Sequence, residues 1–171
     1  MKTCVVVGSG RCVWDDLARA GDVSHMDVMC INDIGMHYPG AVAHWYSNDA
    51  VMLGRWALAR RPGLPAGARL HTNNGAGAGV PEGMRVWEWV HGNSGINAVK
   101  TAFALGYDRV VICGMPLDNS GHYFDPPYIT TNYNNNSTLD DWLRYAVECR
   151  GKVTVMSGNL KEIFGNGEID R

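Results

Sequence analysis

Short apolar runs alternate with segments of helical periodicity along most of the chain. Strands are predicted over Thr3–Val7, Asp27–Ile31, Val42–Tyr46, Val110–Cys113 and Val153–Met156, with a short one around Leu70 and an irregular one around Trp87 and Trp89. Helices are predicted over Val13–Ala20 and Val51–Ala59, from Asn93-Ser94-Gly95 to Gly106, and over Leu139–Ala146 and Leu160–Phe164. This alternation predicts a doubly wound, Rossmann-like α/β fold with a mainly parallel sheet.

Small and polar residues follow several of these apolar runs at once. They are Gly8-Ser9-Gly10, Asn32-Asp33, Ser47-Asn48-Asp49 and Gly114. In an open α/β sheet, ligands bind outside the carboxyl ends of the strands, where backbone amides and helix N-termini converge. Packing alone would require only a turn-forming residue at each place, so repeated Asn, Asp and Ser predict hydrogen bonds to a polar ligand.

The segment from about residue 115 to 137 is too long for an ordinary connection, and its length predicts a lid or an active-site loop. It contains one histidine, His122. An imidazole there can take a proton from an acceptor hydroxyl, with Asp118 or Asp125 orienting the ring, although a surface histidine is the alternative. Other histidines lack metal-ligand spacing and are interpreted, like three tryptophans, as packing or strand-end residues: His37, His44, His71, His91, Trp87, Trp89 and Trp142.

Composition predicts one globular domain over residues 1–171, since 46% of the residues are hydrophobic and the chain is too short for two cores. No apolar stretch approaches a membrane span and the N-terminus is too short for a signal peptide, which predicts a cytoplasmic protein. A net charge of −2 gives no overall basic character, so nucleic acid is not an expected partner; a local basic patch around Arg55, Arg60, Arg61 and Arg69 is the alternative. The five cysteines are scattered and include no Cys-x-x-Cys pair, which favours reduced core thiols.

The turn Gly8-Ser9-Gly10 allows two interpretations. It resembles the start of a dinucleotide fingerprint, but Val13 stands where the third glycine belongs, so NAD binding is not expected. The turn can still present amides to a phosphate, or its glycines can serve the turn geometry alone. The sequence also lacks a Walker pattern and an Asp-x-Asp at a strand end, so any transfer chemistry is expected to need no metal and no cofactor.

The run from Asn93 to Gly114 carries a resemblance to a known family. Its Ser-Gly, its spaced alanines, its Leu-Gly-Tyr and the following strand and glycine resemble the bacterial sialyltransferases that build lipooligosaccharide, and the related motility-accessory glycosyltransferase-like proteins. Further segments agree with that family in order: Val5-Val6-Val7-Gly8-Ser9-Gly10, Asp27-Val28-Met29-Cys30-Ile31-Asn32, Trp45-Tyr46-Ser47-Asn48, Tyr123-x-Asp125 and Met156-Ser157-Gly158-Asn159-Leu160. The resemblance covers most of the chain.

The resemblance implies a nucleotide site and a base. It assigns nucleotide contacts to Ser9, Asn32, Asn48, Ser94 and Gly95, and contacts with the leaving phosphate to Tyr123, Tyr128 and Tyr133. With the strand-end positions, the candidate nucleotide-binding residues are Gly8, Ser9, Gly10, Asn32, Asp33, Ser47, Asn48, Asp49, Ser94 and Gly95. The chain departs from the family in three places: Ser9 replaces an Asn, the Asp usual after Gly114 is displaced to Asp118, and the region of the family's catalytic histidine, Tyr133–Ser137, contains no histidine. His122 is therefore the candidate base.

These features predict a small, metal-independent glycosyltransferase-like protein whose partners are a CMP-type nucleotide sugar and a hydroxyl-bearing acceptor. The alternative is a relative that binds the nucleotide, or hydrolyses the nucleotide sugar, and has lost transferase activity. A third class is an α/β domain that acts through a protein partner and binds no nucleotide. The sequence leaves the oligomeric state open, a homo-oligomer included.

Overall fold

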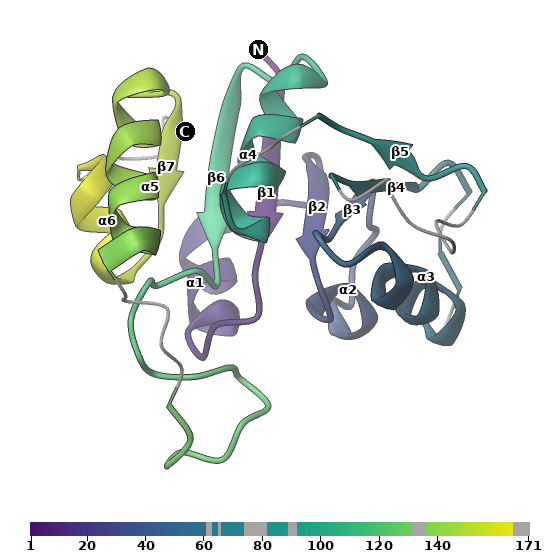
Figure 1. Cartoon of the computed structure of the whole chain (residues 1–171), viewed down its shortest axis with the longest axis horizontal. Coiled ribbons are helices and arrows are strands. Elements are labelled where there is room, and N and C mark those ends of the chain that lie inside the picture. The colour runs from purple at the N-terminus through teal and green to yellow at the C-terminus, as the bar shows by residue number, and fades with distance from the viewer. Residues whose placement is uncertain (61–62, 65, 74–81, 89–91, 131–135, 166–171) are drawn as a thin grey trace.

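The computed structural model describes residues 1–171 with the exception of 61–62, 65, 74–81, 89–91, 131–135 and 166–171. The strands are β1 (Thr3–Val7), β2 (Asp27–Ile31), β3 (His44–Tyr46), β4 (Arg69–Thr72), β5 (Arg85–Val86), β6 (Arg109–Cys113) and β7 (Val153–Val155). They form one sheet in the order β5-β4-β3-β2-β1-β6-β7, and each neighbouring pair is parallel (Figure 1). The described sheet is therefore parallel throughout.

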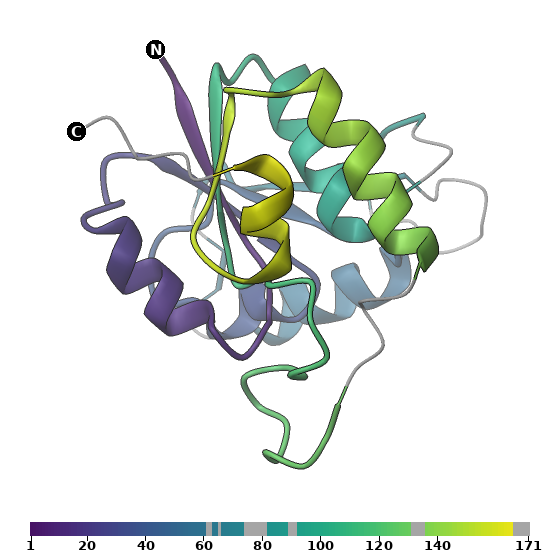
Figure 2. The ribbon, with the colours of Figure 1, turned by 90° about the vertical axis from the view of Figure 1, so that its left-hand side faces the viewer.

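Helices cover both faces of this sheet (Figure 2). One face carries α1 (Val13–Ala20), α2 (Ile34–His37) and α3 (Ala50–Ala59), and the other carries α4 (Ser94–Ala104), α5 (Asn136–Glu148) and α6 (Gly158–Phe164). In β1, Val5 and Val7 pack on the α1 side, while Cys4 and Val6 pack on the α4 side. Because side chains alternate along a strand, a continuous apolar run fits a sheet covered on both faces. The predicted doubly wound α/β fold is confirmed.

The strand order reverses at β1, and this reversal fixes where a ligand can bind. From β1 the chain winds outward through β2, β3, β4 and β5, and it returns along α4 to place β6 on the other side of β1. The connections that follow β1 and β6 lead to helices on opposite faces of the sheet, which leaves a crevice outside the carboxyl ends of these two strands. The two ends are Val7 and Cys113, which are partners in the β1–β6 register. The long segment after β6 projects from the same edge of the sheet (Figure 1).

The structure differs locally from the sequence prediction. Helix α2 follows β2 almost directly, and its four residues are too few to show a helical period in the sequence. Strand β3 begins at His44 instead of Val42, which is buried outside the ladder and therefore resembles a strand residue. The strand expected around Trp87 is β5, which ends just before that residue, and Trp89 lies outside the described residues.

A chain of polar side chains runs through the core from Trp87 to Asp27. The indole N–H of Trp87 donates to His71 Nδ1 at 3.2 Å, and His71 Nε2 lies 2.9 Å from His44 Nδ1. His44 Nε2 lies 3.0 Å from the hydroxyl oxygen of Tyr107, which donates to Asp27 at 2.6 Å. An indole only donates and a carboxylate only accepts, so each group in the chain donates a hydrogen bond to the next one toward Asp27. Each imidazole therefore has one nitrogen that donates and one that accepts, and both rings are neutral. Burial lowers the pKa of His44 and lowers that of His71 to about 3.

The five cysteines are free thiols, and Cys4, Cys30, Cys113 and Cys149 are buried, in agreement with their interpretation as core residues. Burial raises the pKa of the Cys30 thiol to about 12, so this side chain behaves as a small hydrophobic residue. Across the described ranges of the chain, none of the helices combines the length and the apolar character that crossing a bilayer requires.

Candidate functional site

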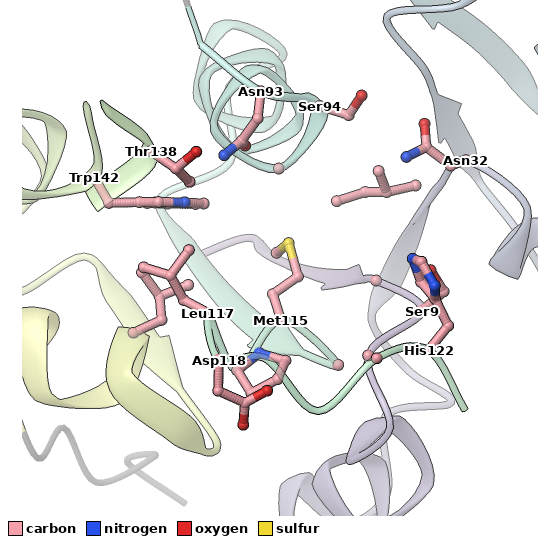
Figure 3. Close-up of a pocket in the computed structure, with 18 residues that line it drawn as sticks. Ser9, Asn32, Asn93, Ser94, Met115, Leu117, Asp118, His122, Thr138 and Trp142 are labelled. Atoms are coloured by element: carbon pink, nitrogen blue, oxygen red, sulfur yellow. The ribbon is translucent and has the colours of Figure 1, made fainter. Parts of the chain in front are cut away.

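A cavity of about 420 Å³ lies outside the carboxyl ends of β1, β2 and β6, at the N-terminus of α4; we call it the strand-end cavity (Figure 3). Its polar lining comes from distant segments: Ser9 after β1, Asn32 after β2, Ser94 at the start of α4, and His122 in the long loop. Its apolar lining includes Leu117 and Trp142, on the opposite side of the cavity from Asn32 and His122. Small-molecule sites in proteins measure roughly 300–1,000 Å³, so the space suits a small ligand.

The glycines after β1 let two turns approach each other closely. The N–H of Gly8 donates to the carbonyl of Cys113 at 2.9 Å, and the N–H of Gly10 donates to the carbonyl of Gly114 at 2.8 Å. A Cβ at either Gly8 or Gly10 would lie 2.7 Å from the oxygen of Gly114. Both amides therefore hold the segment after β6, and the geometric interpretation of these glycines accounts for them without a phosphate.

Helix α4 directs its N-terminus at the strand-end cavity. Asn93 caps the helix, since its side-chain oxygen accepts from the N–H of Ile96 at 3.0 Å. Ser94 and Gly95 begin the helix and line the cavity. A Cβ at Gly95 would lie 2.9 Å from the sulfur of Met115, so glycine keeps this wall close to the segment after β6. The positive end of the helix dipole favours an anionic group at this place.

Asn32 lines the cavity from a left-handed backbone conformation, with φ +53°. This conformation costs an asparagine less than most residues because its short polar side chain bonds locally. Its side-chain oxygen accepts from the buried hydroxyl of Ser47 at 2.8 Å, and the Ser47 oxygen accepts from the N–H of Asp49 at 3.0 Å. Asp49 caps α3 by accepting from Met52 at 2.9 Å. Ser47 and Asp49 therefore support Asn32 and α3 and do not line the cavity.

Asn48 joins β3 to α4. Its side-chain oxygen accepts from the hydroxyl of Tyr46 at 3.1 Å and from Asn97 at 3.2 Å, while its amide group donates to the carbonyl of Gly92 at 3.3 Å. Its backbone N–H donates to the Ser94 hydroxyl at 3.3 Å. Both ends of this side chain are thus engaged within the protein, and Asn48 does not line the cavity. Asp33, which precedes α2, does not line the cavity either. The geometry does not support direct ligand contacts at these positions.

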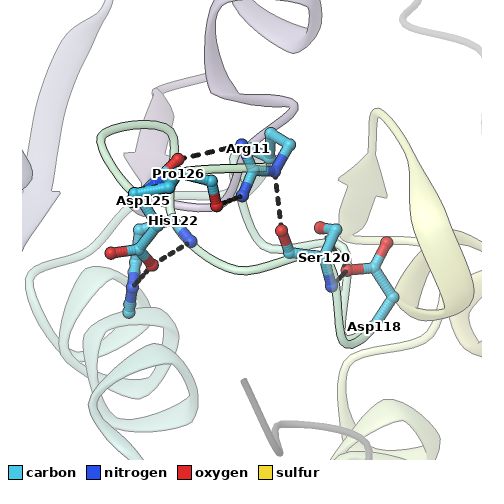
Figure 4. A network of polar contacts seen from close by, with 6 residues as sticks. All are labelled: Arg11, Asp118, Ser120, His122, Asp125 and Pro126. Atoms are coloured by element: carbon cyan, nitrogen blue, oxygen red, sulfur yellow. Dashed lines mark hydrogen bonds and ion pairs between the residues drawn. The ribbon is translucent and has the colours of Figure 1, made fainter. Parts of the chain in front are cut away.

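His122 and Asp125 form a close pair in the long loop (Figure 4). The Asp125 oxygen Oδ2 lies 2.9 Å from His122 Nδ1 and accepts from the His122 backbone N–H at 2.8 Å. The hydrogen bond from the His122 backbone, and after it the one from the His122 side chain, have the largest effect in lowering the pKa of the Asp125 carboxyl. A carboxylate only accepts, so Nδ1 carries a proton and Nε2 is the nitrogen that can take one up. Asp118 also lines the cavity, but its Oδ1 accepts from the N–H and hydroxyl of Ser120 at 2.9 and 2.5 Å. Asp125 is therefore the carboxylate that orients His122.

The tyrosines expected at the leaving phosphate lie elsewhere. The ring centroid of Tyr123 lies 5.4 Å from that of Trp14 and 5.8 Å from that of His37. Tyr123 does not line the cavity. Its hydroxyl oxygen is buried without a hydrogen-bond partner, and burial raises its pKa. Tyr128 is 81% exposed. The backbone N–H of Tyr123 donates to the carbonyl of Ser9 at 3.0 Å, while its side chain packs on Trp14 and His37. Tyr133 lies outside the described residues.

Sequence reasoning missed two parts of this site. Trp142 is buried, as expected of a core residue, and it also lines the cavity. Arg11 holds the long loop, as described below, and nothing in its spacing distinguishes it from a surface arginine. No group of three or more His, Cys, Asp or Glu that could hold a metal ion occurs among the residues whose structure is described.

Comparison of the chain with models of protein families gives no match, and comparisons with curated proteins and with solved structures give none either. The resemblance to the lipooligosaccharide sialyltransferases therefore depends on the sequence motifs alone. What the motifs and the geometry share is the assignment of Ser9, Asn32 and Ser94 to one site.

Proposed function

We propose that this protein binds a CMP-type nucleotide sugar in the strand-end cavity and transfers the sugar to a hydroxyl acceptor without a metal ion. The observation that carries the proposal is the meeting of Ser9, Asn32 and Ser94 around one cavity. They are three of the five positions at which the sialyltransferase-like motifs imply nucleotide contacts; of the other two, Gly95 also lines the cavity and Asn48 does not. The relationship to that family is itself part of the proposal.

The charges around the cavity favour a ligand with a single phosphate. Neither lysine nor arginine occurs among its described lining residues, and Asp118 adds a carboxylate. The N-terminus of α4 supplies about half a positive charge, which suits one phosphodiester. A diphosphate would bring further negative charge next to Asp118 with no cationic side chain opposite it. The apolar side, with Leu117 and Trp142, offers a flat contact for a nucleobase.

In the proposed reaction, His122 Nε2 takes the proton from the acceptor hydroxyl as the acceptor oxygen bonds to the anomeric carbon of the sugar. The bond between that carbon and the phosphate oxygen breaks, and CMP leaves with the electron pair. Asp125 stabilises the imidazolium that forms, because its carboxylate already binds Nδ1 at 2.9 Å. Backbone amides at Ser94 and Gly95 stabilise the charge that builds on the leaving phosphate.

Hydrolysis of the nucleotide sugar is the second candidate. The side chain of His122 is 24% exposed, so water can reach the same base and replace the acceptor. The absence of a histidine in Tyr133–Ser137 favours this candidate as well, because the resemblance places the family's base there. The two candidates share the donor site and differ only in the nucleophile.

Calorimetry with CMP, UMP and GMP, followed by product analysis with CMP-sialic acid, tests the proposal. We expect CMP to bind, and we expect His122→Ala to lower turnover by about 100-fold or more while the affinity for CMP is unchanged. The control is His25→Ala, which changes an exposed histidine between α1 and β2. Released sialic acid without a transfer product would indicate the hydrolase. No binding of any nucleotide, or full turnover by His122→Ala, would contradict the proposal.

A further inference from the structure

Arg11, in the turn after β1, holds the long loop with its side chain (Figure 4) and also with its backbone. Its Nε donates to the carbonyl oxygen of Ser120 at 2.6 Å. Its Nη1 and Nη2 donate to the carbonyl oxygens of Asp125 and Pro126, each at 3.1 Å. Its backbone N–H donates to the carbonyl oxygen of Gly121, also at 3.1 Å. Four donors of a single residue therefore fasten one short stretch of the loop.

That stretch carries the His122–Asp125 pair. The carbonyls that Arg11 binds stand on both sides of the pair in sequence, at Ser120 before it and at Pro126 after it. His122 is also joined to Gly10 by an isolated antiparallel bridge. Loss of the Arg11 side chain would release the loop around the pair without removing any bond between His122 and Asp125. The orientation of the pair to the cavity then depends on fewer contacts.

The contacts require a guanidinium and not only a positive charge. Three carbonyls are bound by three nitrogens of one rigid, planar group. A lysine ammonium places its donors on a single atom at the end of a flexible stem, so it cannot reproduce this spread. Arg11 does not line the strand-end cavity, which separates it from groups that could touch a ligand.

From these contacts we infer that Arg11 is a positioning residue, which fixes the His122–Asp125 pair at the edge of the strand-end cavity. The inference depends on the proposed function in one respect, since the role of His122 as a base is part of that proposal. The fixed orientation itself is a property of the protein without any substrate, and it can be measured separately.

Nitrogen-15 NMR of the histidine rings tests the fixed orientation directly. The bond from Nδ1–H to Asp125 selects one tautomer of His122, whose two ring nitrogens have separate shifts. We expect Arg11→Ala and Arg11→Lys to move both shifts toward the averaged values of a free imidazole. Arg144→Ala is the matched control, because Arg144 pairs with Asp141 on the exposed side of α5 at 2.7 Å. Unchanged His122 signals in Arg11→Ala would overturn the inference.

Turnover of CMP-sialic acid supplies the second readout. We expect kcat to fall by about 10- to 100-fold in both Arg11 variants, since a small displacement of a catalytic group has an effect of that size. The Kd for CMP should not change. A parallel loss of affinity and thermal stability with no change in the ring shifts would show a purely structural role and overturn the inference. If the wild type binds neither CMP nor its sugar, the proposed function fails, while the ring shifts still decide the role of Arg11.

Discussion

At the scale of single residues, polar side chains serve two different purposes at the strand ends. Ser9 and Asn48 both follow a strand and both fit the sequence motifs, but only Ser9 lines the cavity. Asn48 uses its side chain to bind Tyr46, Gly92 and Asn97. Both residues are polar and both stand at the second position after a strand, so the sequence could not separate their roles. The difference is which neighbouring element each side chain faces.

Replacing each of these residues by alanine separates the two roles. Asn48→Ala should lower the free energy of unfolding by about 1–3 kcal/mol, because it leaves buried polar partners unpaired. It should leave the Kd for CMP nearly unchanged. Ser9→Ala should weaken CMP binding and change stability little. Urea denaturation and calorimetry on both variants give the comparison, and weaker CMP binding by Asn48→Ala at full stability would refute this division.

At the scale of elements, the pattern of apolar residues was sufficient to predict most of the fold. Strands β1 and β2 and helix α1 have the predicted bounds, because each combines a buried apolar run or stripe with a clear turn. Helix α2 could not be predicted, since a single turn shows no period. The long loop was recognised by its length alone. Its attachment through Arg11 depends on carbonyl groups, which every residue has, so the sequence contains no sign of it.

The candidate site shows the same limit. The sequence predicted that polar residues would gather at the carboxyl ends of the strands, because parallel strands place these ends at one edge. It could not predict that the Tyr123 side chain would lie outside the cavity lining, since its ring packs on Trp14 and His37, which are distant in sequence. It also could not assign Trp142 to the cavity wall, because a tryptophan on the buried stripe of a helix is expected to pack in the core.

At the scale of the whole molecule, two polar systems lie in different parts of the fold. The strand-end cavity lies outside the carboxyl ends of β1 and β6, and the chain from Trp87 to Asp27 links residues of β2, β3 and β4 through the core. His44 and His71 in that chain are held neutral by burial, and the nearby positive charges Arg69 and Arg85 act in the same direction on the pKa of His71. Folding therefore excludes protons from two groups that the unfolded chain can protonate.

This exclusion predicts acid sensitivity. The folded pKa values of His44 and His71 lie below the value of about 6.5 in an unfolded chain, so stability is complete above pH 6.5 and falls with pH below it. His71, whose folded pKa is about 3, contributes a slope of about 1.4 kcal/mol per pH unit in this window, and His44 changes stability in the same direction. The urea midpoint should be lower at pH 5 than at pH 6.5. This difference should be smaller in His71→Gln and unchanged in His25→Asn. A midpoint that does not change between these pH values would contradict the neutral chain.

The central claim is that the strand-end cavity is the binding site for a nucleoside monophosphate. This binding is tested by titrating the nitrogen-15-labelled protein with CMP while the backbone amide signals are recorded. We expect saturable shifts of the backbone amide signals of Ser9, Asn32, Ser94 and Gly95, the residues that meet around the cavity. Binding in this cavity would be contradicted if these amides did not respond to CMP, or if the responding amides lay on another surface of the protein.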